Sequence, residues 1–118
     1  MRFMRGLASP ASTASAAFQA RYGLQAVSFG NQLWVIGGNT GALTLPNDVW
    51  SSSNGQTWSQ VTAAAAFPGR ALHQSLAFAG RLWVIAGADS SSLLSDVWFP
   101  PRYHVDASDE LCRLHRAL

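Results

Sequence analysis

The chain of 118 residues contains two copies of one sequence pattern, and this repeat limits its possible folds more than any other feature. The run Leu-Trp-Val-Ile at residues 33–36 returns unchanged at residues 82–85, 49 positions later. Other identities at this offset are Phe18 with Phe67, Arg21 with Arg70, Gln25 with Gln74, Phe29 with Phe78, and Gly38 with Gly87. Asp-Val-Trp at residues 48–50 returns at 96–98, so one residue is missing from the loop before it. We therefore expect both copies to form the same structural unit.

Within each copy, short apolar segments alternate with turn residues, which is typical of antiparallel strands. We expect strands at residues 24–29, 32–36, 47–51 and 57–61 in the first copy, and at 74–78, 81–85 and 95–99 in the second. The turn pairs between them are Gly30-Asn31, Asn54-Gly55 and Ala79-Gly80. The continuous apolar runs at the centre of each copy predict strands that are buried on both faces of a sheet.

The order of these motifs resembles the kelch repeat of β-propellers, in the superfamily that includes the central domain of galactose oxidase. Each copy has an Arg, then Leu-Trp-Val-Ile and two small residues, then Asp-Val-Trp, and the first copy adds Asn-Gly-x-Thr-Trp. The resemblance implies blades of four antiparallel strands in about 50 residues, with a double glycine that ends the second strand and a Trp that packs between blades. The positions that match these structural motifs are Gly37, Gly38, Gly87, Trp50, Trp58 and Trp98. Ala86 departs from the pattern, because it stands where the first copy has Gly37.

The expected fold class is therefore all-β, an incomplete propeller of kelch-like blades. Residues 1–12 form an N-terminal flank, 13–61 the first blade, 62–99 a second blade that lacks its last strand, and 100–118 a divergent tail. A propeller has typically 4–8 blades, so two cannot close one. We expect a segment of a longer propeller, completed by further blades in cis or by other chains in trans.

The tail differs in composition from the repeats. Pro100 and Pro101 follow the third strand of the second copy, where the first copy continues into a hairpin, and proline interrupts a ladder of strand hydrogen bonds. Such an abrupt change is what a frame disruption would produce. The tail could also form a short helix that begins near Asp106 or Ser108.

Composition and charge narrow the classes of partner. Only 12% of residues are charged, the formal net charge is +2, and no cluster of basic residues suits a phosphate backbone, so we expect no nucleic-acid partner. No apolar run approaches the roughly 20 residues that span a bilayer, and polar residues interrupt any signal-peptide core near the N-terminus. The Ala- and Ser-rich start would suit an organelle presequence, but it matches residues 62–67 and is assigned to the repeat. A single cysteine, Cys112, forms no internal disulfide and leaves the compartment open.

Candidate binding residues precede the first strand of each copy. The resemblance places Arg21, Arg70 and His73 near the mouth of a propeller's central channel, where a protein or carbohydrate could bind, and the Arg fork suits carboxylates. We favour the alternative that each Arg is structural and binds carbonyl groups of a neighbouring blade. For Asp48 and Asp96 we expect a turn or capping role.

No catalytic residue, cofactor or metal site is predicted. Only one carboxylate recurs in each copy, so no acid–base pair is defined. Cys112-x-x-His115, even with His104, lacks the four ligands of a structural zinc site. A copper-radical oxidase is not supported, since the only tyrosines are Tyr22 and Tyr103 and Cys112 lies in the tail.

These observations predict a non-catalytic segment of a larger protein- or glycan-binding propeller. The alternative is a fragment of a sugar-modifying propeller enzyme, similar to sialic-acid epimerases, with Arg21, Arg70 and His73 as substrate contacts.

Overall fold

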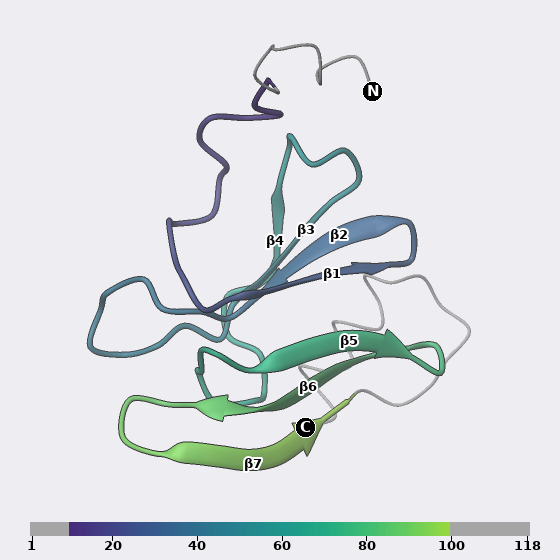
Figure 1. Ribbon diagram of the computed structural model, residues 1–118. Coiled ribbons are helices and arrows are strands. Elements are labelled where there is room, and N and C mark those ends of the chain that lie inside the picture. Colours follow the sequence, from purple (N-terminus) through teal and green to yellow (C-terminus); the bar gives the residue numbers. More distant parts are fainter. Residues whose placement is uncertain (1–9, 100–118) are drawn as a thin grey trace.

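The computed structural model describes residues 10–99, which form two antiparallel β-sheets (Figure 1). The first sheet has the strand order β1-β2-β3-β4, and its strands are β1 (Gln25–Phe29), β2 (Gln32–Ile36), β3 (Val49–Ser52) and β4 (Ser59–Thr62). The second has the order β5-β6-β7, with β5 (Gln74–Phe78), β6 (Arg81–Ala88) and β7 (Leu93–Trp98). The prediction of an all-β fold is confirmed for these residues. The described segment contains no helix that could cross a membrane, and the possible tail helix lies outside it.

The two repeats fold alike at their first hairpin. Val27 pairs with Trp34 in the first sheet, and Leu76 pairs with Trp83 in the second. Each turn has two consecutive residues with positive φ, which suits the right-handed twist of the strands. The Trp34 indole donates to the carbonyl of Phe29 at 2.8 Å, and the equivalent bond in the second sheet is 2.9 Å. The sequence repeat is therefore a structural repeat.

Several strand boundaries differ from those expected by one to three residues, and β7 begins two residues early, at Leu93. β6 continues to Ala88, because a register shift between Ile85 and Gly87 lets it pair with β7 beyond the expected end. β3 begins only at Val49, since the side chain of Asn47 instead donates to two carbonyls of the link between the sheets. Trp58 precedes β4 rather than lying in it.

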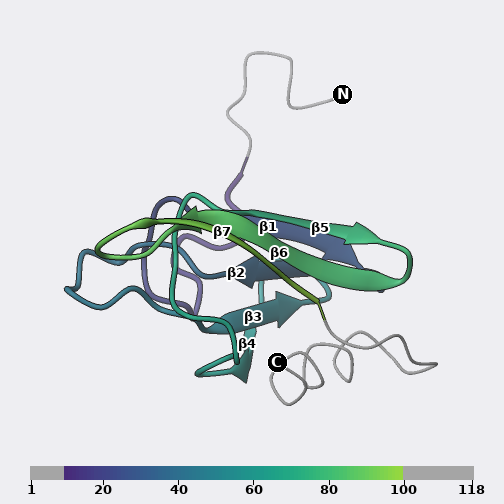
Figure 2. The same ribbon diagram turned by 90° about the horizontal axis from the view of Figure 1, so that it is seen from below.

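The hydrophobic core lies between the two sheets. We call the face of the first sheet that carries Val27, Trp34, Ile36 and Val49 its front face. This face packs on the back face of the second sheet, which carries Leu82, Val84 and the partly buried Trp98. Ala65 and Phe67, from the link between β4 and β5, fill the space between them. Figures 1 and 2 show the two sheets stacked, with β1 and β5 as neighbouring strands.

Three hydrogen bonds also join the sheets. The amide of Gly38 donates to the carbonyl of Arg70 at 2.9 Å, and the amide of Leu72 donates to the carbonyl of Gly23 at 2.7 Å. The amide of Ser75 lies 3.4 Å from its acceptor, the side-chain oxygen of Gln25. All three lie where β1 and β5 begin, so polar contacts fix one edge of the apolar interface.

The back face of the first sheet is partly covered by the segment before β1. Phe18 contacts Trp58 edge-to-face, with 5.1 Å between ring centroids, and lies 6.2 Å from Trp50. Val35 is buried on this face, whereas Leu33 is exposed. Phe18 thus lies on the back of the first sheet as its counterpart Phe67 lies on the back of the second.

Candidate functional site

The recurring arginines are each held in an ion pair with the aspartate of the same repeat. Arg21 donates to both carboxylate oxygens of Asp48, at 2.6 and 3.0 Å. Arg70 donates to both oxygens of Asp96, at 2.6 and 2.7 Å. Such bidentate pairs combine charge attraction with fixed geometry.

A tryptophan and backbone carbonyls complete each pair. The indoles of Trp50 and Trp98 donate to the aspartate two residues before them, at 2.9 and 2.7 Å. Each Arg also donates to two backbone carbonyls of its own repeat, which are those of Gln19 and Gly37 for Arg21 and of Pro68 and Ala86 for Arg70. We call these groups the Arg–Asp–Trp clusters of the first and second repeats. Each connects the segment before the first strand to residues that lie in, or directly next to, the second and third strands of its repeat.

Burial and charge keep the clusters ionised. The Arg70 side chain is fully buried, and that of Arg21 is nearly so. Burial acts to raise the pKa of Asp48, but hydrogen bonds from Arg21 and Trp50 outweigh it and hold this pKa below its usual value. The hydrogen bonds from Arg70 hold the pKa of Asp96 well below its usual range. Neither carboxyl can therefore act as a general acid near neutral pH.

These clusters correct two predictions. Each Arg was expected to bind carbonyls of a neighbouring unit, but its partners are a carboxylate and carbonyls of its own repeat. Asp48 and Asp96 were expected to cap turns, and they instead neutralise the buried arginines. Sequence reasoning missed the pairing because it spans about half a repeat, although the joint recurrence of one Arg and one Asp was the available signal.

His73 lies at the junction of the sheets and is 1% exposed. Within residues 10–99, neither of its ring nitrogens has a hydrogen-bond partner. Burial, helped by the charge of Arg70, lowers its pKa to about 4, so the ring is neutral at pH 7. The ring packs against Gly37, at which a Cβ would lie 2.9 Å from the His73 Cε1. The position therefore fills the inter-sheet contact and is closed to a ligand.

Of the structural motif positions, Gly37 and Gly38 lie at this junction, and the others lie elsewhere. Gly37 has φ +63°, and a Cβ there would also lie 2.9 Å from the carbonyl oxygen of Arg70. Gly38 has φ +115° and donates across the junction, while a Cβ at Gly87 would lie 2.8 Å from the carbonyl oxygen of Ala71. Trp98 packs on the inter-sheet core, whereas Trp50 and Trp58 contact Phe18 on the opposite side of the first sheet.

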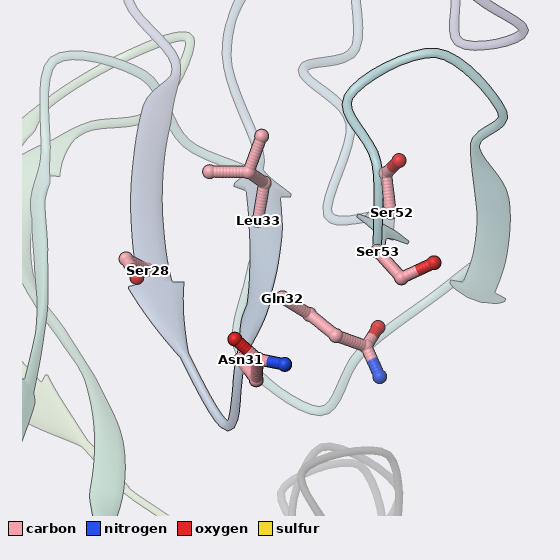
Figure 3. A pocket seen from close by; sticks show the side chains of 6 residues that line it. All are labelled: Ser28, Asn31, Gln32, Leu33, Ser52 and Ser53. Carbon is pink, nitrogen blue, oxygen red and sulfur yellow. The ribbon is translucent and has the colours of Figure 1, made fainter.

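A shallow polar groove lies beside the β1–β2 turn and the end of β3. Figure 3 shows its lining residues, which are Ser28, Asn31, Gln32, Leu33, Ser52 and Ser53. Its volume is about 220 Å³. The hydroxyl and amide groups around it can donate and accept hydrogen bonds, and none of them is titratable near neutral pH.

The groove does not recur. At the positions equivalent to Ser28, Asn31 and Gln32, the second repeat has Ala77, Gly80 and Arg81. The polar character of this groove is therefore not a requirement of the repeat, in contrast to the Arg–Asp–Trp clusters. Sequence reasoning passed over the groove, although the loss of these polar residues from the second repeat was a signal that could have found it.

No protein-family model matches this sequence, and no curated protein matches it. Residues 10–99 contain no cluster of three or more His, Cys, Asp or Glu side chains that could hold a metal ion. His104, Cys112 and His115 lie outside the described residues.

Proposed function

We propose that the chain is a pair of kelch-like blades and serves as a non-catalytic segment of a larger protein- or glycan-binding propeller. Two features support the proposal. Motifs similar to those of the kelch repeat occur in the same order in both copies, up to Asp-Val-Trp, and the sheets built from them stack with a core between their faces. Each blade of a propeller packs on its neighbours in this manner.

The observation that carries the non-catalytic assignment is the saturation of the recurring charged groups. Each Arg makes four hydrogen bonds within its own repeat, and both carboxylate oxygens of each Asp accept from the Arg. A substrate carboxylate would have to displace Asp48, or the partly exposed Asp96, from an arginine that is itself buried. Removing one partner of a buried ion pair is strongly unfavourable, so the clusters suit folding better than substrate binding.

The polar groove is the part of the first repeat that suits a ligand. Its serine hydroxyls and amides match sugar hydroxyls or a peptide backbone, and its lack of charge favours a neutral ligand. The burial of Arg70 and His73 disfavours the alternative, a sugar-modifying enzyme that would use them as substrate contacts.

The test is binding of the full chain to panels of neutral glycans, acidic glycans and peptides. We expect binding to a neutral ligand that weakens at least tenfold in Gln32→Ala, which removes an amide from the groove. Gln56→Ala, which changes an exposed amide outside the groove, is the matched control and leaves binding unchanged. Binding that is insensitive to Gln32→Ala would contradict the assignment of the groove.

A second measurement addresses the enzymatic alternative. Acidic sugars are incubated with the chain in deuterated water, and NMR follows exchange of carbon-bound hydrogen. We expect exchange at the protein-free rate. Faster exchange that Arg70→Lys abolishes would overturn the non-catalytic proposal.

A further inference from the structure

Equivalent faces of the two repeats differ sharply in exposure. The front face of the second sheet carries Leu76, Phe78, Trp83 and Val97, which are equivalent to Val27, Phe29, Trp34 and Val49 in the first. Val49 is 0% exposed, but Val97 is 52% exposed. The second repeat therefore presents openly the face that the first repeat buries.

The back faces show the reverse difference. Leu82, on the back of the second sheet, is fully buried against the first sheet. Its equivalent Leu33, on the back of the first sheet, is 43% exposed. Phe67 is likewise fully buried, whereas its equivalent Phe18 is only partly covered. The internal interface joins a front face to a back face. The chain also exposes a second front face, on the second sheet, and a second back face, on the first sheet.

Phe99 covers only one end of the open front face. Its ring stacks on Trp83, with centroids 4.6 Å apart, and Arg81 lies over it. Leu76, at 42% exposure, and Phe78, at 64%, remain open beside it. An exposed apolar sheet face of this kind marks an interaction site.

The groups that form the polar contacts of the internal interface also occur on the open faces. Within the chain, the Gly38 amide donates to the Arg70 carbonyl. The residues equivalent to this donor and acceptor are Gly87 and Arg21. The side chain of Gln25, which accepts from the Ser75 amide, has the equivalent Gln74, and Gln74 is exposed. The open front face and the exposed side chain of Gln74 therefore offer both apolar and polar groups for a repeated contact.

We propose that the chain self-associates head to tail, with the front face of the second sheet of one copy packed on the back face of the first sheet of another. The occupant is a second copy because the internal interface already shows which surface fits this face. The contact is heterologous, since two different surfaces meet, and the resulting dimer keeps one free surface of each kind for further addition. The inference rests on the stacking of the two repeats. Because Leu33 on the back face also lines the polar groove, a second copy on this face would cover part of the groove, and a ligand there would compete with self-association.

One residue difference should make the contact between copies weaker than the internal contact between the sheets. Ala86, with φ +56°, occupies the position of Gly37, where a Cβ would meet the Arg70 carbonyl at 2.9 Å. In the equivalent contact between copies, the Cβ of Ala86 would approach the Arg21 carbonyl. We therefore expect Ala86→Gly to tighten self-association severalfold.

Sedimentation equilibrium of the full chain tests the proposal. The wild-type chain is expected to show an average mass that rises above 12.6 kDa with concentration. Leu76→Glu on the front face and Leu33→Glu on the back face should each weaken association at least tenfold. An equimolar mixture of the two variants should form a one-to-one dimer that grows no further, because one intact face remains on each. Leu43→Glu, at a loop position 95% exposed, is the control and should associate as the wild type does.

Three results would overturn the proposal: a wild-type chain that stays monomeric at all concentrations, association that survives both variants, or variants that do not combine when mixed. If Leu76→Glu lowers the Tm, Val97→Glu serves as the second front-face variant. None of these measurements involves a glycan or a peptide, so failure here is distinct from failure of the ligand-binding proposal.

Discussion

Arg70 and Asp96 are joined by two short hydrogen bonds within one repeat. This pair ties the segment before the first strand to the third strand of the second repeat, as Arg21 and Asp48 do in the first repeat. The guanidinium of Arg70 is fully buried and stacks near the ring of Phe67, with 5.8 Å between them; Arg21 lies at the same distance from Phe18. Because the whole group recurs with the sequence, we interpret it as part of the folding unit.

Removal of the carboxylate of the first pair should destabilise the chain. Asp48→Ala leaves the nearly buried Arg21 without its counter-ion, and we expect the free energy of unfolding to fall by about 3–5 kcal/mol. Urea unfolding at pH 7 measures this change. Asp89→Asn, at a partly exposed turn carboxylate where Asn keeps the Oδ1 that accepts from the Ser91 and Ser92 amides, should have little effect. Equal losses in the two variants would contradict a special role for the buried pair.

Acidification should weaken the same pair in a defined window. The pKa of Asp48 is lower in the folded chain than in the unfolded chain, where it is near 3.8. The stability that ionised Asp48 adds is therefore complete above about pH 4, and it is lost as the pH falls from there through the lower pKa of the folded chain. Between pH 5 and pH 2.5, the free energy of unfolding should fall less steeply with decreasing pH in Asp48→Asn than in the wild type.

Gly37 should tolerate no side chain because another part of the chain approaches it. Gly37→Ala places a Cβ 2.9 Å from the Arg70 carbonyl and adds the strain of a positive φ. Gly41→Ala is the matched control, since Gly41 has φ +91° with nothing within 4 Å of the added Cβ. We expect Gly41→Ala to cost about 1–2 kcal/mol and Gly37→Ala about 1–3 kcal/mol more. Equal losses in urea unfolding would show that the inter-sheet contact is absent.

His73 should make stability depend on pH between about 4 and 6.5. Its pKa is about 4 in the folded chain and near 6.5 when unfolded, so the unfolded chain binds the extra proton in this range. Stability is unaffected above pH 6.5 and should fall by about 3 kcal/mol as the pH drops to 4. His73→Leu, which places the residue found at the equivalent Leu24, should remove this dependence. A slope that persists in the variant would assign it to other groups.

Equivalent tryptophans should differ in their importance for folding. Trp34 is 0% exposed in the inter-sheet core, whereas Trp83 lies on the open front face of the second sheet. We expect Trp34→Ala to cost about 3–5 kcal/mol and Trp83→Ala markedly less at low protein concentration. Similar losses in thermal unfolding would mean that both faces are covered in the monomer.

Much of the fold could be predicted because the strands follow local signals. The hairpin turns and the paired Leu-Trp-Val-Ile runs place β1, β2, β5 and β6 closely. The extension of β6 escaped prediction because it depends on a register shift against β7, which is a contact between strands and not a local preference.

The site was harder to predict from the sequence. The recurrence of Arg21 and Arg70 indicated a structural role, but the partner of each was fixed by how the strands pair, about half a repeat away. The burial of His73 was also invisible, because it arises from the stacking of one sheet on the other against Gly37.

NMR contacts between methyl groups test the stacking of the two repeats most directly. We expect nuclear Overhauser effects that link Val27, Ile36 and Val49 of the first sheet with Leu82 and Val84 of the second, in dilute full-length chain. Contacts from these first-sheet methyls to Leu76 or Val97, in place of Leu82 and Val84, would contradict the account.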